Sequence, residues 1–357
     1  RPSASVTESG MRITELENSE LTYEKKHEFN VGVDLGFLHN RINLAADYYR
    51  RNNFDLIGVI NTQGAGGTIA KYANIASMRS SGIELTLSTQ NIKKKGFSWN
   101  TDFIFSKTKN EITDLKSHAN VLDLISGNGF GREGYPVRAL FSIPFAGLTE
   151  DGLPTFINQD GQRTISTLNF QEYEKLGFLK YEGPTDPTIT GSFGNILTYK
   201  NFKLNVFLTY SFGNVIRLDP VFSSAYSDLD AMPKEFKNRW MKAGDENTTN
   251  IPTIVSYRMN QQYAYLNMAY NAYNYSDVRI ADGGFIRLKE ISLSYDLPAK
   301  VLNFFRLNKL QFKIQATNLF LLYADSKLNG QDPEFFRSGG VSTPVPRQFT
   351  FTIRLGL

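Results

Sequence analysis

The chain has 357 residues and a formal net charge of +4, which is too small to indicate a nucleic-acid partner. It contains no cysteine, so disulfide frameworks, thiolate metal sites and cysteine nucleophiles are excluded. The histidines lie far apart in the sequence, at His27, His39 and His118, and do not have the spacing of metal ligands. No apolar run reaches the roughly 18 residues of a transmembrane helix.

Segments of alternating apolar and polar residues recur along the chain. They predict β-strands because successive side chains of a strand point to opposite faces. In chain order they predict about ten strands, at 28–37, 41–51, 81–91, 97–107, 137–148, 188–199, 202–213, 285–297, 309–321 and 347–357. The last is the clearest, because Phe349, Phe351 and Ile353 alternate with polar residues to the end of the sequence.

The expected connections alternate between short and long. Tight turns are expected at 38–40, 93–96 and 199–202, and long loops at 52–80, 108–136, 149–187, 214–284 and 322–346. Within the longest loop, residues 233–242 predict a short helix with proline at its start. Residues 1–27 are expected to be an irregular lead-in or loop. Short turns at one end and long loops at the other are typical of outer-membrane barrels.

The predicted strands have the length of a membrane crossing. A tilted strand that crosses a bilayer needs about 9–11 residues, whereas a strand of a soluble protein usually has about 5–6. The polar faces also carry charge, as at Asp34, Glu84, Asp102, Lys313 and Arg354. The pattern therefore favours an all-β fold, a transmembrane antiparallel β-barrel with long extracellular loops, over a soluble sandwich.

Several short motifs stand out along the chain. The most specific are GFIRLKEISL at 284–293 and QATNLF at 315–320. Others are GSFGN at 191–195 with YKNFKL at 199–204, RW at 239–240 followed by AGD at 243–245, and GQDPE at 330–334. These motifs occur in the order in which they are found in the SusC/RagA family of TonB-dependent outer-membrane transporters, so residues 28–357 resemble the C-terminal portion of that family's barrel. The family usually ends in phenylalanine, whereas this chain ends in Leu357.

The resemblance implies a 22-stranded barrel with an N-terminal plug, of which residues 28–357 would supply about ten C-terminal strands. It implies an active importer of oligosaccharides or peptides in the bacterial outer membrane, energised through TonB and working with a SusD-like surface lipoprotein. The N-terminal half of the same barrel and the lipid bilayer would be its other partners. No enzymatic activity and no cofactor are expected.

Candidate substrate contacts lie in the expected loops. Aromatic side chains offer a large contact area with a polar handle for sugars or peptides, and the candidates are Trp240, Tyr257, Tyr263 and Tyr265. Asp332 and Glu334 are also candidates, although we favour a loop turn over acid–base chemistry or calcium binding at this pair. Arg138 and Arg217 could meet acidic ligands, but anchoring at the membrane interface is the favoured interpretation.

Two other functions remain open on the sequence alone. An outer-membrane barrel for adhesion or secretion would share the strand pattern without active import. A soluble all-β glycan-processing enzyme is a third hypothesis, and it would require a buried pair of carboxylates, for which the sequence gives no sign.

Overall fold

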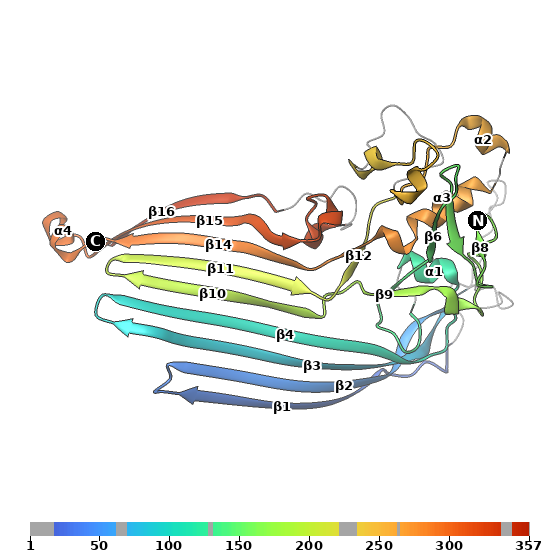
Figure 1. Cartoon of the computed structure of the whole chain (residues 1–357). Helices are drawn as coiled ribbons and strands as arrows, with labels where there is room; N and C mark the ends of the chain where they lie inside the picture. Colours follow the sequence, from blue (N-terminus) through green and yellow to red (C-terminus); the bar gives the residue numbers. More distant parts are fainter. Residues whose placement is uncertain are drawn as a thin grey trace, which may run out of the picture.

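The computed structural model describes residues 18–61, 70–127, 131–220, 234–262, 265–336 and 345–356. Its main feature is a nine-stranded antiparallel sheet in which each strand pairs with the next one along the sheet (Figure 1). Its strands, in spatial order, are β1 (Lys25–Phe37), β2 (Ile42–Asn61), β3 (Ala70–Lys94), β4 (Phe97–Leu115), β10 (Ile189–Tyr199), β11 (Phe202–Phe212), β14 (Phe285–Asp296), β15 (Lys309–Ala324) and β16 (Gln348–Gly356). Nine of the predicted strands are thereby confirmed.

The register brings the apolar residues of all nine strands onto one side of the sheet. Partners across a strand pair share a face, and the pairs include Val31↔Tyr48, Leu44↔Leu87, Leu87↔Phe103, Phe103↔Phe193, Leu197↔Leu204, Leu204↔Leu293, Leu293↔Ile314 and Ile314↔Phe351. We call this side the apolar face. Many of its side chains are exposed, Phe349 at 75% and Phe29 at 62%. The polar partners Asp47↔Glu84 and Gln315↔Thr350 lie on the opposite side, the polar face.

The prediction of a barrel strand at 137–148 is wrong. Two short strands occupy this segment, β5 (Ala139–Ser142) and β6 (Phe145–Leu148), and neither belongs to the nine-stranded sheet. All four residues of β5 are buried, so it is covered on both faces. Pro144 separates the two strands and has no backbone N–H to donate to a ladder. The apolar run thus comes from a buried strand rather than from a half-exposed one.

The predicted loop at 52–80 is also largely wrong, because β2 and β3 continue through most of it. β3 has 25 residues, more than twice the roughly 9–11 that cross a bilayer. β2 is bulged between Asn53 and Ile57, where Asp55 has a positive φ of 56°. β4 likewise extends to Leu115, into the predicted loop at 108–136.

The predicted tight turns are confirmed, and they rely on left-handed backbone. Leu38, His39 and Asn40 have φ values of 53°, 58° and 61° between β1 and β2. Gly96 at 81° joins β3 to β4, and Lys200 at 52° joins β10 to β11. A seven-residue helix, α4 (Ala299–Phe305), joins β14 to β15. All these connections lie at the end of the sheet where the chain terminates (Figure 1).

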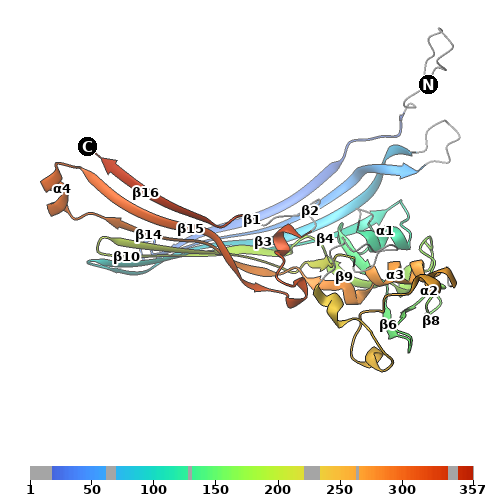
Figure 2. The ribbon, with the colours of Figure 1, turned by 90° about the horizontal axis from the view of Figure 1, so that it is seen from above.

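The described parts of two long connections, from β4 to β10 and from β11 to β14, gather at the other end of the sheet into a folded unit, which we call the loop unit (Figures 1 and 2). Its strands are β5, β6, β7 (Pro154–Ile157), β8 (Arg163–Thr164), β9 (Lys180–Pro184), β12 (Val215–Arg217) and β13 (Ile280–Asp282). Its helices are α1 (Val121–Ser126), α2 (Tyr257–Gln262), α3 (Leu266–Asn274) and the 3-10 turns η1 (Leu176–Phe178), η2 (Lys234–Asn238), η3 (Asp245–Asn247) and η4 (Asp277–Arg279). The helix predicted at 233–242 corresponds to η2, shorter and of 3-10 type.

The loop unit has its own apolar core. Leu124, Phe141, Phe156, Leu266 and Tyr273 are each 1% exposed or less and belong to one cluster. Burial raises the pKa of the Tyr273 hydroxyl to about 12. None of the helices in the described ranges has the length and apolar character needed to cross a bilayer.

The sheet is strongly twisted and curved. Seen from above, the outer strands β1 and β16 rise away from the central strands, and the loop unit lies at one end (Figure 2). β1 and β16 each pair with one neighbour only within the described residues. The sheet is therefore a curved wall with two open edges.

Candidate functional site

A cavity of about 860 Å³ lies where the nine-stranded sheet meets the loop unit. We call it the mouth pocket. Its walls come from segments far apart in the sequence: the polar-face ends of β10 and β11, strands β5 and β12, and the turn η6 (Pro333–Phe335). Its polar lining residues are Ser126, Arg138, Thr185, Asp186, Thr190, Ser211, Asn214, Arg217 and Glu334.

The floor of the mouth pocket is polar and closely fitted. Thr190 and Ser211 face each other across β10 and β11. Beside them, the Gly283 N–H donates to the Asn214 carbonyl at 2.9 Å. A Cβ at position 283 would stand 2.2 Å from Asn214 Nδ2, so any larger residue there would require the Asn214 side chain to move. Asn214 Oδ1 is buried and accepts no hydrogen bond from the described residues, which leaves an acceptor at the pocket lining.

Two arginines flank the pocket, and they have different roles. Arg138 lies 3.0 Å from Asp186, but both side chains are more than half exposed, so the pair is weak. Arg217 is only 4% exposed, and its Nη2 donates to the Phe141 carbonyl at 2.6 Å. The prediction that Arg217 anchors at the membrane interface is therefore wrong, because this side chain ties β12 to β5 inside the loop unit.

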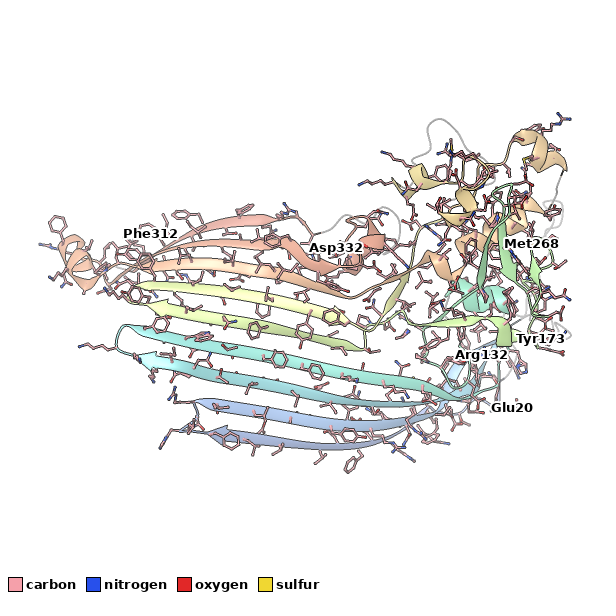
Figure 3. All side chains as sticks on the ribbon, viewed as in Figure 1. Glu20, Arg132, Tyr173, Met268, Phe312 and Asp332 are labelled. Atoms are coloured by element: carbon pink, nitrogen blue, oxygen red, sulfur yellow. The ribbon has the colours of Figure 1, made fainter. Side chains whose placement is uncertain are left out.

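Asp332 and Glu334 are brought together by a third residue that the sequence did not reveal. Arg287 of β14 is 5% exposed, and its Nη2 lies 2.6 Å from Asp332 Oδ1 and 3.0 Å from Glu334 Oε2. Asp332 also accepts the Glu334 N–H at the start of η6. The favoured interpretation as a loop turn is thus confirmed, and Figure 3 places Asp332 toward the loop-unit end of the sheet, away from Phe312. Glu334 also lines the mouth pocket.

Three of the aromatic candidates, Trp240, Tyr257 and Tyr265, do not line the mouth pocket. The Trp240 ring packs over Gly152, where a Cβ would come within 2.4 Å of it, and its Nε1 donates to Glu246 Oε2 at 3.0 Å. That hydrogen bond lowers the pKa of Glu246. Tyr257 is 80% exposed on α2. Tyr265 packs against the core of the loop unit, and Tyr263 lies outside the described residues.

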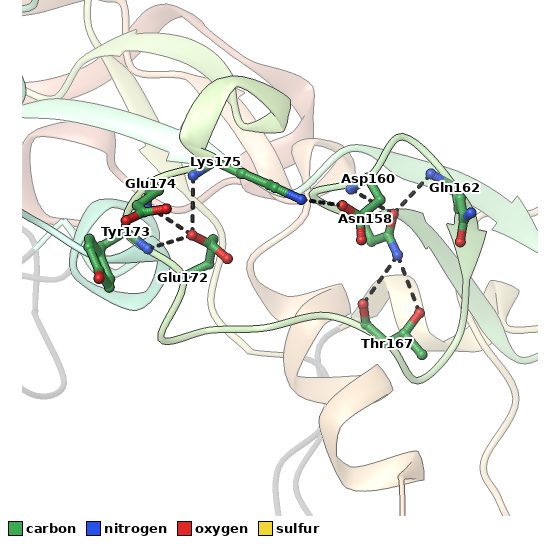
Figure 4. A network of polar contacts seen from close by, with 8 residues as sticks. All are labelled: Asn158, Asp160, Gln162, Thr167, Glu172, Tyr173, Glu174 and Lys175. Carbon is green, nitrogen blue, oxygen red and sulfur yellow. Dashed lines mark hydrogen bonds and ion pairs between the residues drawn. The ribbon is translucent and has the colours of Figure 1, made fainter.

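A polar network holds the loop around β8 on the outer side of the loop unit (Figure 4). Glu172 Oε1 accepts the backbone N–H groups of Tyr173, Glu174 and Lys175 at 2.9–3.2 Å. These bonds, the one from Glu174 foremost, hold the pKa of Glu172 below its ordinary value. Lys175 Nζ reaches Asp160 at 2.8 Å.

The mouth pocket is lined by groups that can bind a polar ligand. It offers hydroxyls, an amide, a carboxylate and a guanidinium to a polar ligand. Across the described ranges no three His, Asp or Glu side chains are placed to hold a metal ion. Sequence reasoning missed Thr190, Ser211 and Asn214, because short polar side chains at strand ends give no distinctive pattern. The Gly283–Gly284 pair was the one available signal of a close approach.

Comparisons with known proteins agree with the fold. No family model matches the sequence. TonB-dependent receptor P3 of Formosa agariphila is 25% identical over 349 residues, which cover 91% of this chain and 32% of that protein. TonB-dependent receptor SusC of Bacteroides thetaiotaomicron is 27% identical over 363 residues, covering 95% of this chain and 32% of that protein. The chain thus spans about a third of the length of these curated relatives.

Solved structures give the same picture. The RagAB peptide transporter superposes with a TM-score of 0.73 and 22% identity over 96% of this chain and 36% of that chain. The 'open-open' state of the RagAB peptide importer superposes with a TM-score of 0.71 and 21% identity, over 94% of this chain and 35% of that chain. These relatives are receptors and transporters of the outer membrane rather than enzymes, in agreement with the prediction of no catalytic role. Over most of its length this chain is therefore related to SusC/RagA-type TonB-dependent receptors, and it corresponds to a part of their barrel.

Proposed function

We propose that the chain forms part of the barrel wall of an active importer that brings oligosaccharides or peptides across the outer membrane. The observation that carries the proposal is the apolar face, which runs unbroken across nine strands while the opposite face is polar. Soluble monomers rarely expose contiguous apolar patches beyond a few hundred Å². The large exposed apolar face is therefore unexpected in a soluble monomer. It is explained if lipid hydrocarbon covers the apolar face and water covers the polar face.

The height of the apolar face suits an outer-membrane bilayer. At the short-turn end an aromatic row crosses it, made of Phe97, Tyr199, Phe202, Tyr295 and Phe312, which pair across consecutive strands. Aromatic girdles mark the interfaces of membrane barrels. The first cationic side chain beyond this row on β4, Lys107, lies ten residues from Phe97. At about 3.3 Å per residue and a tilt of about 40°, ten residues give a height of about 25 Å, the usual apolar band.

In this proposal the barrel closes with strands outside this chain, 22 in all, around an N-terminal plug that TonB moves. Closure is required because an open sheet edge in hydrocarbon leaves backbone groups unpaired. A SusD-like lipoprotein would cover the loop unit. The RagAB likeness and the TonB-dependent receptors among the relatives support these partners.

The substrate would enter past the mouth pocket. The mouth pocket suits a ligand with many hydrogen-bonding groups, such as a peptide or an oligosaccharide, because it is lined by hydroxyls, Arg138, Glu334 and the Asn214 amide. The peptide transporter among the similar structures supports peptides as one such class. Glu334 is the strongest of the sequence-derived contacts because it lines this pocket, while Tyr257 is the exposed aromatic candidate on the loop unit.

The test is uptake by cells that lack the protein, complemented with wild type or with Arg138→Ala/Glu334→Gln. We expect wild-type cells to take up a peptide or oligosaccharide pool in an energy-dependent manner, and the double variant to need a higher substrate concentration for the same rate. Lys200→Ala at the far end of the sheet is the control and should behave as wild type. Uptake that persists after the proton-motive force is collapsed would instead favour the adhesion or secretion barrel.

A further inference from the structure

A cluster of positive charge lies on the apolar face, where a membrane protein would be expected to avoid it. Arg50, Arg79, Lys107 and Lys109 project from β2, β3 and β4 on that side of the sheet, since they occupy the same alternate positions as Tyr48, Ile83 and Phe105. We call these four residues the basic cluster. All four are exposed.

Three members of the basic cluster, Arg50, Arg79 and Lys109, line a surface pocket of about 260 Å³. Its lining residues are Tyr48, Arg50, Arg79, Ser81, Lys109 and Glu111. The register explains the gathering, because Arg50 pairs with Ser81 and Ser81 with Lys109, which places their side chains next to one another across three strands. Ser81 and the Tyr48 hydroxyl add neutral donors to the charged ones.

The charges are only partly compensated within the described residues. Lys109 Nζ lies 3.5 Å from Glu111, and Arg79 Nε donates to Asn52 at 3.3 Å. The side chains of Arg50 and Lys107 make no ion pair or hydrogen bond with any described residue. Three cations, Arg50, Arg79 and Lys109, line the pocket beside one carboxylate, with Lys107 close by, so the pocket carries a net positive charge that a nearby anion would stabilise.

The height of the basic cluster above the aromatic row indicates what kind of anion it would bind. The cluster lies about 25 Å above the aromatic row, at the upper limit of the apolar band and on the side of the long loops. Long loops face outward in barrels of this kind, so this level is that of the headgroups of the outer leaflet. A lipid chain against Ile83 and Phe105 would place its headgroup at the cluster.

We propose that the basic cluster binds the phosphorylated headgroup of an outer-leaflet lipid. Guanidinium groups match phosphate oxygens with paired hydrogen bonds, and lysines add compact positive charge. The ligand is a lipid rather than a free anion because the pocket is continuous with the apolar face, which holds the acyl chains. The inference rests on the membrane placement proposed above.

The experiment measures lipid binding by native mass spectrometry on the complete barrel, in which the missing strands accompany this chain, purified in detergent from the outer membrane. The probes are a phosphatidic acid, which bears a phosphate monoester, and a phosphatidylcholine with the same acyl chains. We expect wild type to prefer phosphatidic acid, and Arg50→Gln/Arg79→Gln/Lys107→Gln/Lys109→Gln to bind it at least about tenfold more weakly. The control is Lys93→Gln/Lys94→Gln/Lys95→Gln/Lys200→Gln, which removes four exposed charges at the short-turn end and should retain the preference.

Three outcomes would overturn the inference. They are equal binding of the two lipids by wild type, an equal loss in both variants, and displacement of phosphatidic acid by inorganic phosphate at an equal concentration. Recovery of each variant from the outer membrane in a heat-resistant folded form shows that its barrel is intact. A wild-type protein that is absent from the membrane would instead contradict the proposed function, so the two failures are distinguishable.

Discussion

Arg287 of β14 contacts both acidic residues of η6, the turn in the connection between β15 and β16. Its guanidinium is buried between the aromatic rings of Phe285 and Phe335, at 5.3 and 5.9 Å from their centroids, and it reaches both Asp332 and Glu334. The Asp332 side chain is 8% exposed, whereas that of Glu334 is 42% exposed. The two ion pairs should therefore contribute very differently to stability, because water screens the second.

We expect Asp332→Ala to destabilise the folded protein by about 3 kcal/mol, because it leaves a buried guanidinium with one half-exposed partner. Glu334→Gln is the matched control and should cost less than about 1 kcal/mol. Urea unfolding of both variants in liposomes, with the missing strands supplied and followed by tryptophan fluorescence, gives the comparison. Equal losses would mean that Arg287 does not depend on Asp332.

Glu172 provides a prediction with a defined pH dependence. Its carboxylate accepts N–H groups from Glu174, Lys175 and Tyr173, and these bonds lower its pKa below the ordinary value of 4.5. A lowered pKa in the folded state means that the bonds stabilise the turn above pH 4.5 and that this stabilisation is lost as the pH falls through the lowered pKa.

We therefore expect amide hydrogen exchange at 173–175, corrected for its intrinsic pH dependence, to speed up on acidification in the wild type. In Glu172→Ala these amides should exchange rapidly at every pH. The amides of α3 serve as an internal reference and should be unaffected. Unchanged protection of 173–175 in the variant would show that the carboxylate does not hold this turn.

At the scale of the elements, the two faces of each strand should respond oppositely to charge. Phe349 lies on the apolar face of β16, and its neighbour Thr350 on the polar face. We expect Phe349→Arg to destabilise insertion by about 2–4 kcal/mol, since arginine near the middle of the lipid face is costly. Thr350→Arg should be nearly neutral. The fraction that folds into liposomes over a urea series measures both, and a larger effect at Thr350 would reverse the assignment of the two faces.

Strand length distinguishes the membrane part of the sheet from the part outside it. β10 and β11 have 11 residues each, close to one crossing, whereas the β2–β3 hairpin continues well past the basic cluster. The bulge at Asp55 and the hydrogen bonds of Asn74 to Thr22 and Asp55 support this extension. Polar contacts within the hairpin and with the segment before β1 thus stabilise this extension.

At the scale of the whole molecule, the two open edges determine how the chain can exist. β1 and β16 each pair with a single neighbour among the described residues, and unpaired backbone groups cannot remain in hydrocarbon. We expect the chain expressed alone to give no heat-resistant folded band in gel electrophoresis, and a polypeptide that supplies the missing strands to restore it. A heat-resistant band from the chain alone would show that these nine strands close on themselves or on a second copy.

The sequence by itself determined the strands, their alternation, the tight turns and the family resemblance, because each of these depends on neighbouring residues along the chain. It also placed Asp332 and Glu334 in a turn. It erred at 137–148 and at 52–80, where burial inside the loop unit and pairing beyond the membrane replaced the expected pattern. Only the tertiary structure assembled the mouth pocket, the Arg287 contacts and the basic cluster, because their members are up to about 200 residues apart in the chain. Strand register brings the basic cluster together, and the packing of the loops against the sheet forms the mouth pocket.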